Sequence, residues 1–251
     1  MARESFLTFP PGAVAEKPQR IPVLWNEPGA IILNKPPGLL AFEKSGHPDT
    51  FQSVLANINE RAIPGSQFSR FNIERVAAVN WLAREASGIL LFATSDQSKA
   101  SLRNELGSRR FVFRYRFFSQ GKPESAQLEC RLPVARHRAE PRALISHRTG
   151  KKTETRFHRI QELGNLAIWE SESSYDRFHQ VRLHAAEVGI PILNDPLYGP
   201  PEEEVRIKRD PEPFLLHLAS LSFPWINQTI TVEAFPPREF ERLIRRTTSR
   251  R

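Results

Sequence analysis

Two short segments hold the side chains whose types and spacing could carry out chemistry. The first is the polar turn at residues 83–88, Ala-Arg-Glu-Ala-Ser-Gly, which lies between apolar, β-branched runs at 76–82 and 88–93 that predict buried strands. The second covers residues 174–184, Ser-Tyr-Asp-Arg-Phe-His-Gln-Val-Arg-Leu-His. A sharp polar turn at the rim of a sheet is a common place for catalytic and binding groups. We expect the two segments to face each other.

The residue types argue against a metal or cofactor site. His179 and His184 are five residues apart, but no second histidine pair or cysteine cluster accompanies them. Cys130 is the only cysteine, which excludes an internal disulfide and a thiolate cluster and fits a reducing compartment. There is no glycine-rich phosphate loop, and Ser87 is more simply a turn residue than a nucleophile. We therefore expect no metal and no cofactor.

The charge of the chain favours an anionic partner. Lys and Arg total 36 against 28 for Asp and Glu, giving a formal net charge of +8 and a sequence pI of about 10.0. The densest basic segment covers residues 133–152, where only Glu140 opposes six cations. Like charges repel, so this segment is predicted to be either a solvated loop or an arm that contacts RNA, and we favour the arm.

Periodicity predicts a mixed set of helices and strands. Residues 1–20 are rich in proline and are expected to form an arm or a loose tail. Strands are predicted at 21–27 and 30–36 around Pro28-Gly29, at 111–121, and as a hairpin at 155–163 and 165–173. Helices are predicted at 50–62, capped by Asp49-Thr50, and at 96–106, capped by Ser95-Asp96.

Three motifs of the chain, at residues 34–38, 80–89 and 177–199, resemble those of the RluA family of RNA pseudouridine synthases. The family pattern of His-Arg-Leu-Asp, three variable residues and Ser-Gly-Leu here reads Asn80 to Ala83, three residues, then Ser87-Gly88-Ile89. Its Asn-Lys-Pro-x-Gly turn is matched at residues 34–38. Its second pattern, Thr-Gly-Arg-Thr-His-Gln-Ile-Arg-x-His with a downstream Gly-x-Pro-Ile-x-x-Asp-x-x-Tyr-Gly, is matched at Arg177, His179, Gln180, Arg182, His184, Gly189, Pro191, Asp195, Tyr198 and Gly199. The resemblance extends from about Val23 to Pro237.

The resemblance implies an α+β architecture with the pseudouridine synthase fold. In that fold a mixed, mainly antiparallel central β-sheet is flanked by helices and loops. We expect an N-terminal arm at 1–20, one synthase-like domain at 21–237, and a basic C-terminal helix and tail at 238–251.

The resemblance also implies a catalytic site from which the key group is missing. The family's essential aspartate falls at Ala83, which has no side-chain oxygen and cannot act as a nucleophile. The family's base-contacting tyrosine falls at Tyr115, and the arginine that pairs with the aspartate falls at Arg182. Glu85 and Asp176 are conceivable substitutes for the aspartate. We expect Asp176, Glu85 or an RNA phosphate to neutralise Arg182, because an unpaired buried charge is costly.

Three functions follow from these patterns. The leading hypothesis is a protein of this fold that binds structured RNA, such as rRNA or tRNA, and lacks isomerase activity. The second is an active synthase that uses Asp176 or Glu85, and the third is a module whose basic surface binds an acidic protein. We expect a cytoplasmic monomer that does not enter a membrane. The predicted RNA contacts are Lys35, Arg114, Arg116, Arg136, Arg138, Arg142, Arg148, Lys151, Lys152, Arg177, His179 and Gln180.

Lys35 has a second interpretation. Two prolines and a glycine follow it, so it sits on a stiff turn that would hold the ammonium for a phosphate. The same turn is equally consistent with a purely structural role.

Overall fold

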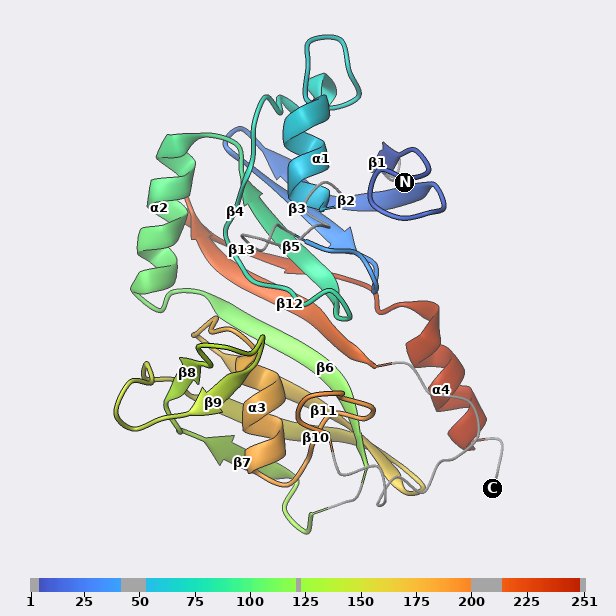
Figure 1. Cartoon of the computed structure of the whole chain (residues 1–251), viewed down its shortest axis with the longest axis vertical. Coiled ribbons are helices and arrows are strands. Elements are labelled where there is room, and N and C mark those ends of the chain that lie inside the picture. The colour runs from blue at the N-terminus through green and yellow to red at the C-terminus, as the bar shows by residue number, and fades with distance from the viewer. Residues whose placement is uncertain (1–4, 42–52, 121–122, 200–213, 249–251) are drawn as a thin grey trace. The chain divides into compact units, whose positions relative to one another are not determined.

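The computed structural model describes residues 5–41, 53–120, 123–199 and 214–248, which form two compact units (Figure 1). Unit 1 contains the chain up to Phe111 together with Ser220–Phe235. Unit 2 contains Val112–Ala219 and the chain from Pro236 onward. Each unit therefore consists of two separate stretches of the sequence.

Unit 1 is built on an antiparallel ladder in the order β1-β2-β3-β5. Its strands are β1 (Ser5–Phe9), β2 (Gln19–Glu27), β3 (Ala30–Lys35) and β5 (Ser87–Ala93), with the short β4 (Ala77–Ala78) also paired with β5. All seven residues of β5 are buried, as its continuous apolar sequence predicts. The tight turn predicted at Pro28-Gly29 is confirmed, because it joins β2 directly to β3.

Two helices and a short 3₁₀ segment complete the first part of unit 1. They are α1 (Val54–Arg61), η2 (Ser69–Phe71) and α2 (Asp96–Gly107), and α2 contacts β5. The start of α2 agrees with the prediction, since Ser95 caps it and forms a reciprocal capping box with Ser98. The helix α1 begins after the cap Ser53. The predicted cap at Asp49-Thr50 lies outside the described residues.

An aromatic cluster anchors the C-terminal part of unit 1. The strand β12 (Leu216–Trp225) pairs antiparallel with β13 (Gln228–Glu233). Phe223 lies edge-on to Trp25 at a ring distance of 5.7 Å and stacks on Phe111 at 5.6 Å. Such ring contacts add to the apolar burial.

Unit 2 is built on a second antiparallel ladder, in the order β6-β11-β10-β7. The strands are β6 (Val112–Gln120), β11 (Leu166–Ser173), β10 (Thr155–Leu163) and β7 (Gln127–Cys130), beside a separate hairpin of β8 (Val134–Arg136) and β9 (Ala143–Ile145). The predicted hairpin through Gly164 is confirmed by β10 and β11. Cys130 is buried in β7.

Two helices pack against this second ladder. The helix α3 (Gln180–Glu187) contacts β7 and β9, and α4 (Arg238–Thr248) contacts β10 (Figure 1). On α4, Phe240 and Leu243 are buried against Phe118 and neighbouring apolar residues. The C-terminal helix predicted within residues 238–251 is therefore confirmed. No helix within the described ranges is long and apolar enough to cross a membrane.

Three predicted elements differ from the structure. Residues 5–9 were expected in an arm, but they form β1, in which Leu7 and Phe9 are fully buried. Of the strand predicted at 76–82, only the two residues of β4 form a strand. The basic segment at 133–152 is not an extended loop, because it contains the paired strands β8 and β9.

Candidate functional site

A buried ion pair lies at the centre of the segment that carries the second sequence pattern. Arg182, in the first turn of α3, donates from Nε to Asp195 Oδ2 at 2.8 Å and from Nη2 to Oδ1 at 2.6 Å. The side chains are 3% and 0% exposed, so the bidentate pair is removed from water. Asp195 Oδ1 also accepts backbone N–H bonds from Leu197 and Tyr198. The pair therefore ties the loop after α3 to the helix.

The third nitrogen of Arg182 is also engaged, through His179. Arg182 Nη1 lies 3.3 Å from His179 Nε2, and His179 Nδ1 lies 3.0 Å from the hydroxyl of Tyr198. Burial and the neighbouring Arg182 lower the pKa of His179 to about 3, so the imidazole is neutral at physiological pH. Because a guanidinium only donates, Nε2 accepts and Nδ1 carries the proton that it donates to Tyr198.

Asp195 is the anion that neutralises Arg182. We had expected Asp176, Glu85 or an RNA phosphate in this role, and the structure corrects that expectation. The matching aspartate was visible in the sequence thirteen positions beyond Arg182, but sequence spacing could not show that the loop folds back onto the helix. Arg182 is thus satisfied entirely within unit 2.

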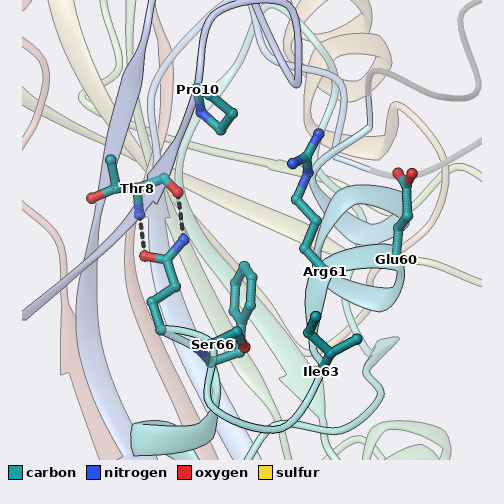
Figure 2. A pocket seen from close by; sticks show the side chains of 8 residues that line it. Thr8, Pro10, Glu60, Arg61, Ile63 and Ser66 are labelled. Carbon is teal, nitrogen blue, oxygen red and sulfur yellow. Dashed lines mark hydrogen bonds between the residues drawn. The ribbon is translucent and has the colours of Figure 1, made fainter.

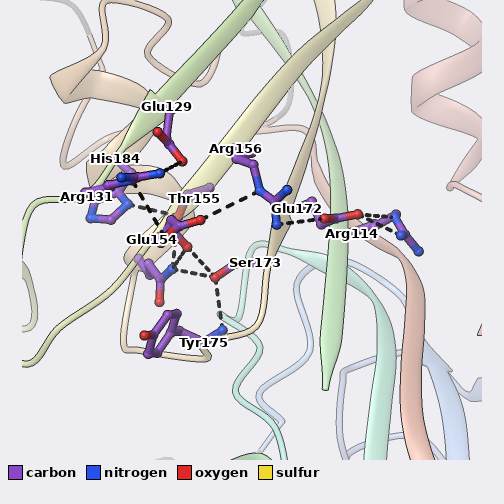
Figure 3. A network of polar contacts seen from close by, with 11 residues as sticks. Arg114, Glu129, Arg131, Glu154, Thr155, Arg156, Glu172, Ser173, Tyr175 and His184 are labelled. Carbon is purple, nitrogen blue, oxygen red and sulfur yellow. Dashed lines mark hydrogen bonds and ion pairs between the residues drawn. The ribbon is translucent and has the colours of Figure 1, made fainter. Parts of the chain in front are cut away.

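A polar network joins α3 to β10 and β11 (Figure 3). The amide nitrogen of Gln180 donates to Thr155 Oγ1 and Ser173 Oγ, both at 2.9 Å, and also reaches the carbonyl of Glu154. His184 bonds Thr155 Oγ1 through Nδ1 at 2.9 Å and lies 2.9 Å from the Leu132 carbonyl through Nε2.

The same network corrects a predicted RNA contact. Gln180 is 3% exposed and its amide is used inside the protein, so it positions α3 and is not presented to RNA. Arg177 precedes it, and Arg177 Nε is buried without a hydrogen-bond partner among the described residues.

Tyr115 and its arginine neighbours occupy opposite faces of β6. Tyr115 is buried, while Arg114 and Arg116 lie on the other face, as the alternation of a strand requires. Arg114 pairs with Glu172 at 2.7 Å and Arg116 with Glu170 at 3.0 Å, each with the residue directly opposite on β11. We had expected the arginines to meet phosphates around a base stacked on Tyr115. The strand separates them from the tyrosine, and cross-strand glutamates engage them.

The charge of Asp176 affects the pKa of Tyr115. Burial, and secondly the charge of Asp176, raise the pKa of the Tyr115 phenol well above its usual value. The phenol is therefore protonated at physiological pH and keeps its O–H donor. One of the two substitute carboxylates considered from the sequence thus lies beside the tyrosine that the resemblance assigns to the site.

In unit 1, Lys35 fixes the loop that contains Ala83. The Lys35 side chain is fully buried, and Nζ donates to the carbonyls of Pro36 at 3.0 Å, Leu39 at 2.9 Å and Arg84 at 3.1 Å. Burial lowers the pKa of Lys35 to about 7, although the charge of Glu85 acts in the opposite direction. The structure corrects the predicted phosphate contact, because all three donors of the ammonium are used by the backbone.

The turn and the loop are joined by further bonds. Gly38 N donates to the Arg84 carbonyl at 2.8 Å, and Arg84 Nε donates to the Gly38 carbonyl at 3.1 Å. Gly38 has a φ of +85°, a conformation that favours glycine. These hydrogen bonds link residues 36–39 to residues 83–85, where Ala83 is partly buried and Glu85 is exposed.

Asn80 explains why the predicted strand at 76–82 ends early. Its Nδ2 donates to the Ile89 carbonyl at 3.1 Å, and its Oδ1 accepts from Leu91 N at 2.8 Å. The side-chain amide thus replaces a backbone partner of β5, and the chain leaves the ladder after Val79. The next residue, Trp81, is 46% exposed.

The basic segment 133–152, which contains the β8–β9 hairpin and is called the basic hairpin below, carries six of the twelve predicted RNA contacts. The side chains of its predicted contact residues are exposed, and these are Arg136, Arg138, Arg142, Arg148, Lys151 and Lys152. Tyr198 fixes the hairpin, because its hydroxyl accepts from Ala143 N at 2.6 Å. Within the described residues, no group of three or more His, Cys, Asp or Glu side chains could hold a metal ion.

The comparison with known families decides where this chain belongs. A family model described as RNA pseudouridylate synthase matches residues 29–187, well over half of the sequence. The chain belongs to this family. It is 28% identical over 233 residues to an uncharacterised RNA pseudouridine synthase of Synechocystis, covering 90% of this chain and 69% of that protein. It is 26% identical over 244 residues to ribosomal large subunit pseudouridine synthase D of Zymomonas mobilis, covering 94% and 76%.

Solved structures show the same fold. Human RNA pseudouridylate synthase domain containing 4 matches with a TM-score of 0.71 at 16% identity, covering 90% of this chain and 92% of that one. Human RNA pseudouridylate synthase domain containing 1 matches with a TM-score of 0.65 at 17% identity, covering 91% and 87%. The predicted α+β pseudouridine synthase fold is confirmed.

Two features of this family member were not foreseen from the sequence. Phe178 lies between Arg136 of the hairpin and the ring of His179. The only sign of this stack in the sequence is an aromatic residue within a polar segment. In unit 1 an open pocket of about 520 Å³ is lined by residues of β1, α1 and the following segment (Figure 2). At its side, the Gln67 amide exchanges two hydrogen bonds with the Thr8 backbone. Gln67 thereby protects the outer edge of β1.

Proposed function

We propose that this family member binds structured RNA, such as rRNA or tRNA, without isomerising uridine. The observation that carries the proposal is the identity of residue 83. By the resemblance at Ser87-Gly88 and the following strand, Ala83 corresponds to the family's aspartate, and a methyl group can neither attack a nucleoside nor accept a proton.

The state of Arg182 supports the proposal. A chain that lost an aspartate partner would leave a buried arginine uncompensated, at a cost of about 3–5 kcal/mol. Here Asp195 accepts both parallel hydrogen bonds and His179 occupies the remaining nitrogen. Arg182 is therefore stable without any carboxylate at position 83.

RNA binding is supported by the family and by the charge of the chain. Six exposed cations gather in the segment 133–152, and only Arg142 of these has an acidic partner, Glu140, within the described part of the chain. Phosphate contacts from such residues supply affinity without requiring a reaction.

A second candidate function is an active synthase that uses Asp176. The observation that favours it is the electrostatic coupling of Asp176 to the buried phenol of Tyr115. Glu85 is a weaker candidate because it is exposed and acts mainly on the Lys35 ammonium.

The test uses purified protein and total RNA from cells that lack the gene. Pseudouridine is quantified by nucleoside mass spectrometry before and after incubation, and RNA binding is measured in parallel. We expect binding with no gain of pseudouridine. A gain that Asp176→Asn abolishes and Glu85→Gln does not would replace the proposal with the second candidate, and absence of RNA binding beyond that of an equally basic control protein would overturn both.

A further inference from the structure

A column of stacked side chains rises from α3 to the surface of the basic hairpin. Its base is His179, whose ring stacks on Phe178 with centroids 3.9 Å apart and planes 18° apart. Its top is the guanidinium of Arg136, which lies 4.7 Å above the Phe178 ring. All three residues belong to unit 2, and Arg136 is the exposed one.

The lower part of the column is rigid. His179 is held by Tyr198 through Nδ1 and by Arg182 through Nε2, and Arg182 is fixed by Asp195. Phe178 packs against the small apolar cluster that joins β8, β9 and α3. The pKa of His179 is lowered to about 3, so its imidazole is neutral at physiological pH. His179 therefore adds no positive charge that would repel Arg136.

The upper part is a charged plane without an acidic partner. Within the described residues no carboxylate pairs with Arg136, whereas Arg142 on the same hairpin pairs with Glu140 at 2.6 Å. The Phe178 ring lies against the Arg136 guanidinium, and Arg136 is nevertheless exposed to solvent. Arginine planes and aromatic rings are the groups on which proteins stack unpaired nucleobases.

We propose that Arg136, seated on Phe178, stacks an unpaired nucleobase of the bound RNA. This inference rests on the proposed RNA binding and adds that one RNA base in contact with the hairpin is unstacked from its neighbours. A simple phosphate contact would need the charge of Arg136 but neither its plane nor the ring beneath it. Lysine keeps the charge and loses the plane, so Arg136→Lys separates the two roles.

The experiment compares two single-stranded probes of equal length and charge, a twelve-nucleotide uridine RNA and a fully abasic ribose-phosphate chain. Binding is measured by fluorescence anisotropy at one fixed salt concentration, because affinity depends steeply on salt. Arg136→Lys is expected to weaken binding of the uridine RNA about five- to tenfold, which corresponds to about 1–1.4 kcal/mol, the low end of the range for stacking of one base. It should change binding of the abasic chain less than about twofold.

The matched control is Arg103→Lys, since Arg103 is an exposed arginine on α2 and is not one of the predicted RNA contacts. It should change binding of both probes less than about twofold. Phe178→Leu keeps an apolar side chain in its cluster and should reproduce the selective loss, with a thermal melt to show that it folds. A uridine RNA with one 2-aminopurine should lose fluorescence on binding the native protein and lose less on binding Arg136→Lys.

Each other result counts against a specific claim. Equal weakening of both probes by Arg136→Lys would reduce Arg136 to an anion contact and overturn the stacking, while RNA binding would stand. The same would follow if Arg136→Lys and Arg103→Lys behaved alike. Failure of the native protein to bind either probe or folded RNA would overturn the proposed function, and the stacking with it.

Discussion

Asp195→Asn tests whether Asp195 is the anion that compensates Arg182. The substitution keeps an oxygen for the Leu197 and Tyr198 amides but removes the charge and puts an amide nitrogen against the Arg182 donors. Because the pair is almost fully buried, we expect a loss of about 3–5 kcal/mol in the free energy of unfolding. Urea denaturation followed by circular dichroism measures it.

Glu172→Gln is the matched control for burial. It removes the charge of Glu172, whose Oε2 accepts from both Nε and Nη2 of Arg114, but the two side chains are 33% and 36% exposed, so the expected loss is about 1 kcal/mol or less. The double variant Arg182→Met with Asp195→Leu removes both buried charges and should regain most of the stability lost in Asp195→Asn. If Asp195→Asn cost no more than Glu172→Gln, Arg182 would be compensated by some other group and the reasoning would fail.

Three further predictions concern residues that position the site. The pKa of Lys35 is lowered on folding to about 7, so protonation of Lys35 favours the unfolded chain. The free energy of unfolding should therefore increase by about 2 kcal/mol from pH 7 to pH 9. This increase should be missing in Lys35→Met. The pKa of His179 is lowered to about 3, so stability should be complete above about pH 6.5 and fall by about 1.5 kcal/mol on acidification to pH 5; a His179→Gln variant with the same acid dependence would contradict this. Asn80→Ala should cost about 2 kcal/mol or more in guanidinium unfolding, because the Ile89 carbonyl and Leu91 amide in buried β5 lose their partner; a change below about 0.5 kcal/mol would show that β5 repairs the gap.

Local patterns predicted the regular elements well. The apolar run of β5, the Pro28-Gly29 turn and the capped start of α2 each depend on neighbours in the sequence, and all three were confirmed. The strand at 76–82 was wrong because the Asn80 amide competes with the backbone for β5. Propensity gives no sign of such a substitution of side chain for main chain.

Contacts between distant segments explain most of the differences at the site. Lys35 looked like a surface cation, but the Arg84 carbonyl, 49 residues away, helps to bury its ammonium. Arg114 and Arg116 looked available, but the register of β6 with β11 places a glutamate opposite each. The residue types were therefore predictable, whereas their partners depend on tertiary structure. The RNA contacts assigned to the exposed hairpin, and the domain boundaries at residues 20 and 237, stay predictions.

The most direct test of the central claim is made in cells. The protein is cross-linked to RNA by ultraviolet light, the cross-linked sites are sequenced, and each site is examined for pseudouridine in cells with and without the gene. We expect a discrete RNA site whose uridines are unmodified in both. A pseudouridine at that site that disappears when the gene is deleted would contradict the account and assign the reaction to a carboxylate other than one at position 83.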